Sequence, residues 1–403
     1  MPDERMDGTL RDKATGLAAD ISAASATDMS AVPATDTPAV PATDTPAVPA
    51  TPAPATDTPA APATDPSSAA RVRLDRLWAR GTDFLGCRHA ILGGAMSWVS
   101  EQHLVSAISN AGGFGVIACG AMNPTQLADQ IAGTQARTDK PFGVNLITMH
   151  PELDDLIRVT LAAKVGHIVL AGGIPPAPAI RAVKDGGAKL IAFSPALSLA
   201  RRLVRSGADA IVIEGSEAGG HIGPVSLTVL AQEILPHLRD VPVFVAGGLG
   251  RGEAILSYLE MGASGAQLGT RFAASVESIA HAKFKKFFVH ANARDAMPSV
   301  ELDPRLPVIP VRGLVNDGTK QFLQHQAETR DKLLAGEVNR EEAQLLVERF
   351  WAGALRRAVI EGDIETGSVM AGQSVGMVTS VQPVAEIIQE LVGQAVAALA
   401  ARG

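Results

Sequence analysis

From residue 71 onward, short apolar runs alternate with longer stretches in which apolar residues recur at helical spacing. Nearly all the short runs are continuously apolar, which is typical of strands buried on both faces of a parallel sheet. The strand candidates are residues 88–93, 114–118, 142–147, 166–171, 188–193, 208–213, 241–246 and 265–268. The helix candidates are residues 101–111, 124–136, 153–164, 176–186, 197–206, 226–238, 251–261 and 274–289.

Strands separated by helices of this length predict right-handed crossovers and a parallel sheet. The fold class is therefore α/β, and we predict a closed (β/α)8 TIM barrel, because eight buried strands suit closure better than an open sheet. An open, doubly wound sheet is the alternative. In a barrel the loops that follow the strands form one mouth, where barrel enzymes place their active sites.

The two ends of the chain depart from this rhythm. Residues 1–70 repeat Ala-Val-Pro-Ala-Thr-Asp-Thr-Pro and hold few large apolar side chains, so we predict a disordered tail there and a barrel over 71–291. Residues 292–403 are predicted as a lid-like addition to the barrel. We expect an irregular excursion over 292–340, a helix at 341–360 and an amphipathic helix at 383–401. The last helix is expected to pack on the barrel, with a homodimer contact as the alternative.

Composition narrows the function classes. The net charge of the 403-residue chain is −7, which gives no electrostatic reason to expect a nucleic-acid partner. The apolar runs are too short or too broken to span a membrane, and residues 1–30 lack the basic start and apolar stretch of a secretory signal. The two cysteines, Cys87 and Cys119, form neither a disulfide framework nor a metal-ligand spacing. We therefore expect a cytoplasmic protein without a metal.

Glycine and polar residues gather directly after the strand candidates, where the mouth would lie. Among them, Gly219-Gly220-His221 follows the strand at 208–213. Glycines at strand ends leave backbone N–H groups accessible to a phosphate or a flavin ring, and histidine titrates near neutral pH. The alternative for this motif is structural: a tight turn that carries a surface histidine. The candidate residues are Gly94, Ala95, Met96, Asn145, Glu214, Gly219, Gly220, His221, Gly247, Gly248, Gln267, Leu268, Gly269 and Thr270.

Several of these motifs, in this order, resemble those of the nitronate monooxygenase (2-nitropropane dioxygenase) family. The residues that carry the resemblance are Gly93-Gly94-Ala95-Met96-Ser97-Trp98, Pro141-Phe142-Gly143-Val144-Asn145, Glu217-Ala218-Gly219-Gly220-His221, Ala246-Gly247-Gly248 and Gln267-Leu268-Gly269-Thr270-Arg271-Phe272. The resemblance runs from about residue 84 to 380. The flavin-dependent enoyl-acyl carrier protein reductases, a sister group, share these motifs. Residues 353–363 and 368–373 look especially similar to those reductases.

The resemblance implies a (β/α)8 barrel that binds FMN non-covalently. Asn145 and Glu214 would then contact the flavin, and His221 matches the catalytic base of the family. Gly219, Gly248, Gln267, Gly269 and Thr270 would hold the ribityl chain and phosphate. Two positions depart from the family pattern: many nitronate enzymes carry glutamine where this chain has Glu214, and a lysine of some members aligns with Phe193.

The resemblance implies an FMN-dependent oxidoreductase that oxidises nitroalkanes or nitronates with O2 to carbonyl compounds and nitrite. The alternative is an NAD(P)H-dependent enoyl-acyl carrier protein reductase, in which His221 donates a proton. The basic cluster His281-Lys283-Lys285-Lys286 is expected to be a solvated helix face. In the reductase alternative, an acidic carrier protein would be a partner and this cluster its candidate docking face. A flavin-binding module without catalysis is an alternative of another class.

Overall fold

The computed structural model describes residues 66–402, apart from residues 121 and 307. The predicted tail therefore lies almost entirely outside the described residues. The first described element is the helix α2 (Pro66–Leu77), so the boundary predicted at residue 70 falls inside this helix.

Eight parallel strands form the main sheet, and all of them coincide with predicted strands. They coincide because each strand is a nearly continuous apolar run, which becomes stable when it is buried on both faces of the sheet. They are β1 (Ile91–Gly93), β2 (Gly115–Ala118), β3 (Phe142–Ile147), β4 (His167–Ala171), β5 (Lys189–Phe193), β6 (Ala210–Glu214), β8 (Val243–Ala246) and β9 (Gly265–Leu268).

The main sheet closes on itself. Its strand order is β1-β9-β8-β6-β5-β4-β3-β2, and the two end strands meet through a parallel bridge between Leu92 and Phe114. Gly93 N donates to Phe114 O at 2.9 Å, and Phe114 N donates to Ile91 O at 2.9 Å. The predicted (β/α)8 barrel is confirmed, and the doubly wound sheet is excluded because such a sheet has open edges.

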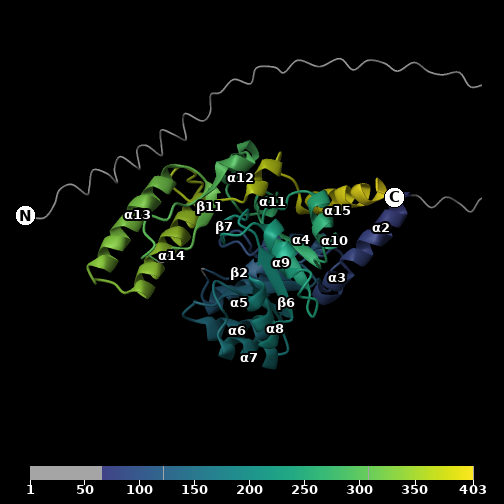
Figure 1. Ribbon diagram of the computed structural model, residues 1–403, viewed down its shortest axis with the longest axis horizontal. Coiled ribbons are helices and arrows are strands. Elements are labelled where there is room, and N and C mark those ends of the chain that lie inside the picture. Colours follow the sequence, from purple (N-terminus) through teal and green to yellow (C-terminus); the bar gives the residue numbers. More distant parts are fainter. Residues whose placement is uncertain (1–65, 121, 307, 403) are drawn as a thin grey trace, which may run out of the picture. The chain divides into compact units, whose positions relative to one another are not determined.

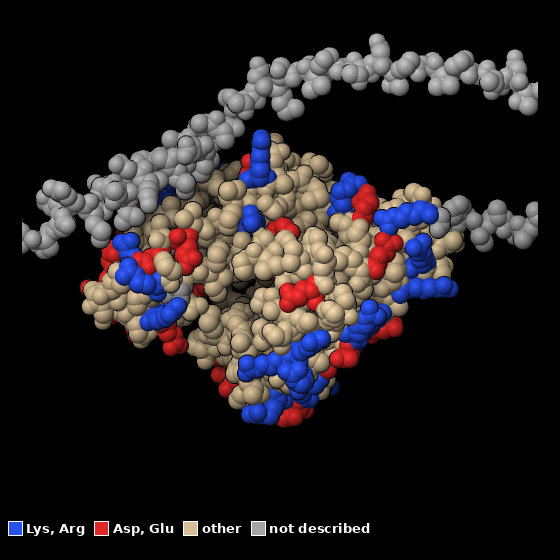
Figure 2. Space-filling model, viewed as in Figure 1, with Lys and Arg blue, Asp and Glu red and all other residues tan. Residues whose placement is uncertain are grey.

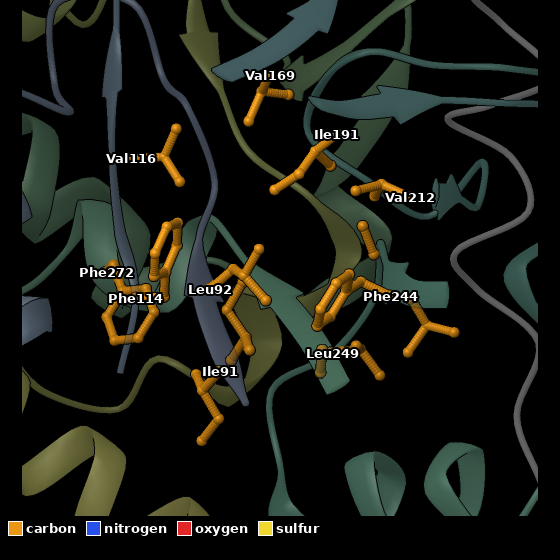
Figure 3. Packing of buried hydrophobic residues seen from close by; sticks show 14 of the residues in the cluster. Ile91, Leu92, Phe114, Val116, Val169, Ile191, Val212, Phe244, Leu249 and Phe272 are labelled. Atoms are coloured by element: carbon orange, nitrogen blue, oxygen red, sulfur yellow. The ribbon is translucent and has the colours of Figure 1, made fainter. Parts of the chain in front are cut away.

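Side chains from alternate positions of the strands fill the barrel. Figure 3 shows Val116, Val169, Ile191, Val212 and Phe244 around a common space inside the barrel. Each of them is at most 4% exposed. Because side chains alternate along a strand, Glu214, two positions beyond Val212, faces the same interior.

A short helix covers the N-terminal end of the barrel. This helix, α3 (Ala79–Leu85), places the carbonyl oxygen of Phe84 where the Nε2 of His167 contacts it at 2.9 Å and Lys189 Nζ donates to it. Burial lowers the pKa of His167 to about 4, the nearby Lys189 lowers it too, and the hydrogen bond to Phe84 opposes them. His167 is therefore neutral near pH 7 and serves to close this end of the barrel.

Helices surround the strands. They are α4 (Gln102–Asn110), α5 (Pro124–Gln135), α6 (Leu153–Ala162), α7 (Ala177–Asp185), α8 (Leu197–Arg205), α9 (Leu227–Ile234), α10 (Gly252–Glu260), α11 (Thr270–Ala273) and α12 (Ala282–His290). The single helix predicted at 274–289 is wrong in its start. The chain instead makes the short α11 and then a loop, and α12 begins only where the His281 ring accepts a hydrogen bond from Lys283 N.

Residues 292–340 are more regular than predicted. They contain a 3-10 turn (Ala293–Asp295), the strands β10 (Ala296–Pro298) and β11 (Val311–Leu314), and the 18-residue helix α13 (Asp317–Leu334). The helix α14 (Arg340–Arg356) and a π-helical turn (Arg357–Glu361) match the helix predicted at 341–360. Figure 1 shows α13 and α14 as a helical hairpin beside the barrel.

A second, antiparallel sheet joins this hairpin to the barrel. Its central strand β11 pairs with β10, with β12 (Val369–Met370) and with β7 (Gly220–His221). The strand β7 belongs to the loop that follows β6 of the barrel, so residues far apart in sequence share one ladder. A 3-10 turn (Gln373–Met377) follows β12.

The last helix, α15 (Val384–Ala400), confirms the helix predicted at 383–401. Its apolar residues Val384, Ile387, Ile388 and Leu391 are buried, and the helix packs on α2 and α10. Arg271 of α11 ties it to the barrel, because its guanidinium lies 2.7 Å from Glu390 Oε2. The predicted packing role of this helix is thus confirmed.

Candidate active site

Three polar side chains face the barrel interior near the mouth. Asn145 of β3, Glu214 of β6 and Gln267 of β9 are in register with inward-facing residues of their neighbours. Asn145 is only 5% exposed, whereas Glu214 and Gln267 are partly exposed. None of the three side chains hydrogen-bonds to another group in the described part of the chain. Their amide and carboxyl groups therefore have the hydrogen-bonding capacity to bind a polar ligand.

Glu214, the acidic residue among the three, has an altered pKa. Burial raises the pKa of Glu214 from 4.5 to about 7, and the nearby charge of His221 works in the opposite direction. Glu214 therefore populates both its neutral and its ionised form near neutral pH. A carboxyl in this state can donate a hydrogen bond as well as accept one.

Two glycine-containing loops approach each other at the ends of β1 and β9. Gly94 N donates to Leu268 O at 2.8 Å, and the half-buried Ala95 and Met96 follow it. A side chain at Gly269 would meet only the sulfur of Met96, 3.5 Å from its Cβ. The space in front of Gly269 is therefore open, and a ligand group can approach its backbone closely.

The loop after β8 is built from a left-handed glycine pair. Gly247 and Gly248 have φ values of +97° and +70°, which residues with a side chain rarely adopt. A Cβ on Gly247 would lie 2.9 Å from Gly215 O, and one on Gly248 would lie 2.9 Å from Glu217 Cβ. These glycines allow the loops after β6 and β8 to pack together at the mouth.

The segment at residues 369–372 covers another part of the mouth. Gly372 N donates to Thr270 Oγ1 at 3.0 Å. A Cβ on Gly219 would lie 2.5 Å from Gly372 N, so Gly219 is required for this contact. Thr270, predicted to contact a phosphate, thus already holds the segment that follows β12.

His221 lies on β7, opposite Val311 of β11, and its side chain is 43% exposed. Its Nε2 lies 3.0 Å from Oε2 of Glu348, which comes from α14. Sequence reasoning missed Glu348, because a glutamate on a mostly polar helix carries no signal that it faces the barrel.

The helix α14 also contacts the loop after β1. The guanidinium of Arg356 lies 5.7 Å from the centre of the Trp98 ring, within the range of a cation–π contact. Trp98 has a left-handed φ of +67°, and its indole N–H is buried without a hydrogen-bond partner among the described residues. Figure 2 shows the surface hollowed near the middle of this face, in the region where Figure 1 labels β2 and β7.

All the residues predicted for the site lie at the C-terminal ends of the barrel strands. Direct contacts join the loops after β1, β6, β8 and β9, whereas Asn145 on β3 is related to them only through the sheet register. The unpartnered Asn145 and the open space at Gly269 fit a flavin ring with a phosphate-bearing chain. The basic docking face is not a continuous surface, because Lys285 is buried and donates to Ser278 O at 2.6 Å.

No group of three or more His, Cys, Asp or Glu side chains in the described residues is arranged to hold a metal ion. No helix among them has the length and apolarity that crossing a membrane requires.

The fold defines the protein as a (β/α)8 barrel with its candidate site at the C-terminal mouth. A family model described as nitronate monooxygenase matches residues 79–160 and 148–394. The chain therefore belongs to the nitronate monooxygenase family and is a flavin-dependent oxidoreductase.

Three relatives show the breadth of the similarity. FabK from Thermotoga maritima is 38% identical, with a TM-score of 0.70 over 78% of this chain and 95% of that structure. The nitronate monooxygenase of Paraburkholderia phytofirmans is 27% identical over 76% of this chain and 92% of its own length. A protein of Mycobacterium tuberculosis, the (3aS,4S,5R,7aS)-5-hydroxy-7a-methyl-1-oxo-octahydro-1H-indene-4-carboxyl-CoA dehydrogenase, is 30% identical over 78% of this chain and 95% of its own length.

Proposed function

We propose that this chain is an FMN-dependent oxidoreductase that acts on the α,β carbon–carbon bond of an acyl thioester. The observation that carries the proposal is the position of residues 368–373, the segment that looks especially similar to the enoyl-acyl carrier protein reductases. Its strand β12 pairs with β11, which also pairs with the strand of His221. Gly372 then contacts Thr270 at the mouth. The reductase-like segment is thus part of the candidate site.

The relatives support a thioester substrate. Identity to FabK is 38%, compared with 27% to the nitronate monooxygenase of Paraburkholderia phytofirmans. The mycobacterial relative is named as the dehydrogenase of a carboxyl-CoA, which is itself a thioester. Glu214 occupies a position at which many nitronate enzymes carry glutamine and the reductases tend to carry glutamate, which favours the reductase side of the family.

Several residues of the mouth would hold FMN. Asn145, Glu214 and Gln267 would face the ring and ribityl chain, and the glycine loops at Gly248 and Gly269 would receive the phosphate on backbone N–H groups. A bound flavin would supply the hydride chemistry, which no amino-acid side chain provides. We place the reaction in the cytoplasm, in keeping with the free thiols of Cys87 and Cys119.

His221 would handle the proton of the reaction. Reduction of an enoyl thioester adds a hydride at Cβ and a proton at Cα, and dehydrogenation of the saturated thioester removes both. A histidine at the mouth can donate or remove the Cα proton near neutral pH. Glu214, neutral in part of the molecules, can donate a hydrogen bond to a ring nitrogen or carbonyl beside it.

Anaerobic flavin spectroscopy tests the proposal. FMN-loaded protein is mixed with NADH or NADPH, and crotonyl-CoA is then added. We expect the nicotinamide to bleach the flavin absorbance and the enoyl thioester to restore it, with butyryl-CoA as product. In the dehydrogenase direction, butyryl-CoA alone would bleach the flavin. A flavin that responds to neither thioester, tested also with longer acyl chains, would contradict the proposal.

Nitronate oxidation is the second candidate, and membership in the nitronate monooxygenase family favours it. Here a nitronate and O2 yield a carbonyl compound and nitrite, and His221 would remove the α-proton of a neutral nitroalkane. Nitrite release from ethyl nitronate in air, with no response to thioesters, would replace the thioester proposal. Stable flavin binding without either reaction would indicate a non-catalytic flavin-binding module.

A further inference from the structure

The contact between His221 and Glu348 joins the barrel to an element outside it. Glu348 Oε2 lies 3.0 Å from His221 Nε2, and their side chains are 25% and 43% exposed. Among the described residues, Glu348 forms no other ion pair, so its charge is directed to this ring alone. The sequence gives no reason to connect the two residues, because the strands β8 to β11 and the helices α9 to α13 lie between them in the chain.

The backbone segments that carry the two residues are joined to the same small sheet and apolar cluster. His221 is the direct partner of Val311 across the β7–β11 ladder, and Ile222 N donates to Pro310 O at 2.9 Å. Val311 belongs to the apolar cluster that contains Val347, the neighbour of Glu348 on α14. Strand pairing and apolar packing therefore hold β7 and α14 close enough for the ring and the carboxylate to meet.

The charges around His221 come from two directions. Glu348 faces it from α14, and Glu214 acts on it electrostatically from the end of β6. Burial raises the pKa of Glu214 to about 7, so this carboxyl is partly neutral near neutral pH. Glu348 is the carboxyl in direct contact with the ring.

We propose, on the basis of the proposed function, that Glu348 is a positioning residue that orients the imidazole of His221 and stabilises its protonated form. The contact occupies Nε2, which leaves Nδ1 as the nitrogen directed to substrate. In thioester reduction a bound flavin, reduced by a nicotinamide, would supply the hydride that Cβ receives, and the electron pair of the C=C bond moves to Cα. His221 then forms the Cα–H bond with its proton and becomes neutral. In dehydrogenation the imidazole takes the Cα proton, and Glu348 stabilises the resulting cation.

The test compares Glu348→Gln with Glu341→Gln in the FMN-loaded full chain. Glu341 lies exposed on the first turn of the same helix, so its substitution is a matched control for charge and helix. Nitrogen NMR of the ring reads the protonated fraction and tautomer of His221 directly, with His221→Asn used to assign its signal among the nine histidines. We expect Glu348→Gln to reduce the protonated fraction several-fold at pH 7, as removal of a neighbouring opposite charge does. Glu341→Gln should leave it unchanged.

Turnover provides the second measurement. Glu348→Gln should lower kcat on the preferred substrate by about tenfold or more, with little change in KM or flavin content, and Glu348→Asp should recover part of the loss. The alkaline limb of the pH–rate profile for reduction should move to lower pH in Glu348→Gln, because reduction requires the protonated ring.

The outcomes separate this inference from the proposed function. An unchanged ring signal in Glu348→Gln overturns the inference whatever the substrate. A changed ring signal in a protein that does not turn over thioesters supports the pairing and contradicts the thioester proposal. If the variant does not fold, the wild type provides the test. Raising the salt concentration should screen the half-exposed pair and lower the protonated fraction, and a salt-independent signal would overturn the inference.

Discussion

Arg312 donates from its Nε to the backbone carbonyl of Ser216 at 3.0 Å. The same guanidinium donates to Ala296 O, so one buried side chain links β11, β10 and the loop after β6. The strand partner of Arg312 is Gly220, next to His221. A residue outside the barrel thus fixes the loop that carries the candidate acid–base group.

Replacing Arg312 with methionine should therefore affect both stability and activity. The free energy of unfolding should fall by about 1.5–3 kcal/mol, the usual size for hydrogen bonds to a charged group, and turnover should fall about tenfold. Urea denaturation and steady-state kinetics measure these effects. The control is Lys320→Gln, which removes an exposed pair with Asp317 on the nearby helix α13 and should change stability by less than about 1 kcal/mol. Equal losses in both variants would contradict this role.

Substitutions of two glycines should separate folding of the mouth from flavin binding. Gly219→Ala places a Cβ 2.5 Å from a backbone nitrogen and should destabilise the protein, whereas Gly223→Ala meets nothing within 4 Å and should not. Gly269→Leu instead extends into open space at the mouth and should cost most of the bound flavin with only a small change in stability. Flavin absorbance per chain and thermal melting measure the two effects. Full flavin content in Gly269→Leu would contradict the proposed phosphate site.

The raised pKa of Glu214 predicts a specific pH dependence of stability. Between pH 4.5 and about 7 the folded state retains a proton that the unfolded state has lost, so ionisation of Glu214 destabilises the fold as pH rises through this window. Glu214→Gln should remove this decline and be relatively more stable at pH 8 than at pH 4.5. The stability of the variant must be compared with that of the wild type at each pH. Burial lowers the pKa of His89 and His167 to about 4, so in both proteins these histidines add a contribution to stability that rises with pH. A pH-independent difference between the two proteins would contradict the assignment.

His221→Asn should lower turnover by about a hundredfold or more, because a positioned acid or base contributes roughly that factor. Flavin should remain bound, since the glycine loops proposed to receive its phosphate follow other strands. The rate of flavin reduction by nicotinamide should change little. The rate of flavin reoxidation by the enoyl thioester should account for the lower turnover. Rapid-mixing spectroscopy separates the two half-reactions. Turnover within a few-fold of the wild type would contradict the catalytic role and leave His221 only a structural role in the turn.

The N-terminal region offers a further test. Deletion of residues 1–65 should leave flavin content, turnover and melting temperature nearly unchanged, because the sequence of this region holds few large apolar side chains. Deletion of residues 1–77 removes α2 with the buried Leu74 and should lower the melting temperature by several degrees. A large loss of stability in the shorter deletion would show that the tail contributes to the fold.

The barrel was predictable because its signal is local. Each strand is a largely apolar run, and glycine or a polar residue marks the turn that follows it. The helix α13 was missed for the opposite reason: its buried face combines Phe322 with Gln326 and Thr329, so the apolar periodicity is broken. Its start was still encoded, because the Asn316 side chain accepts a hydrogen bond from Thr319 N in a capping box.

The site was predictable only where it is built from strand ends. Asn145, Glu214 and Gln267 each end or nearly end a recognisable strand, so their position at the mouth follows from the barrel. Glu348 depends on the pairing of β7 with β11 and on the packing of α14, and no local pattern records such long-range contacts. Position in the fold, rather than residue type, gives that glutamate its significance.

The ladder between β7 and β11 also links breathing motions of the protein to its chemistry. The bond from Ile222 N to Pro310 O must break whenever the small sheet separates from the barrel loop, and the neighbouring His221 is released in the same event. Hydrogen exchange of the Ile222 amide therefore reports how often the molecule opens at this point. Substitutions that loosen the α13–α14 hairpin should accelerate that exchange and depress turnover while the barrel still melts at its original temperature.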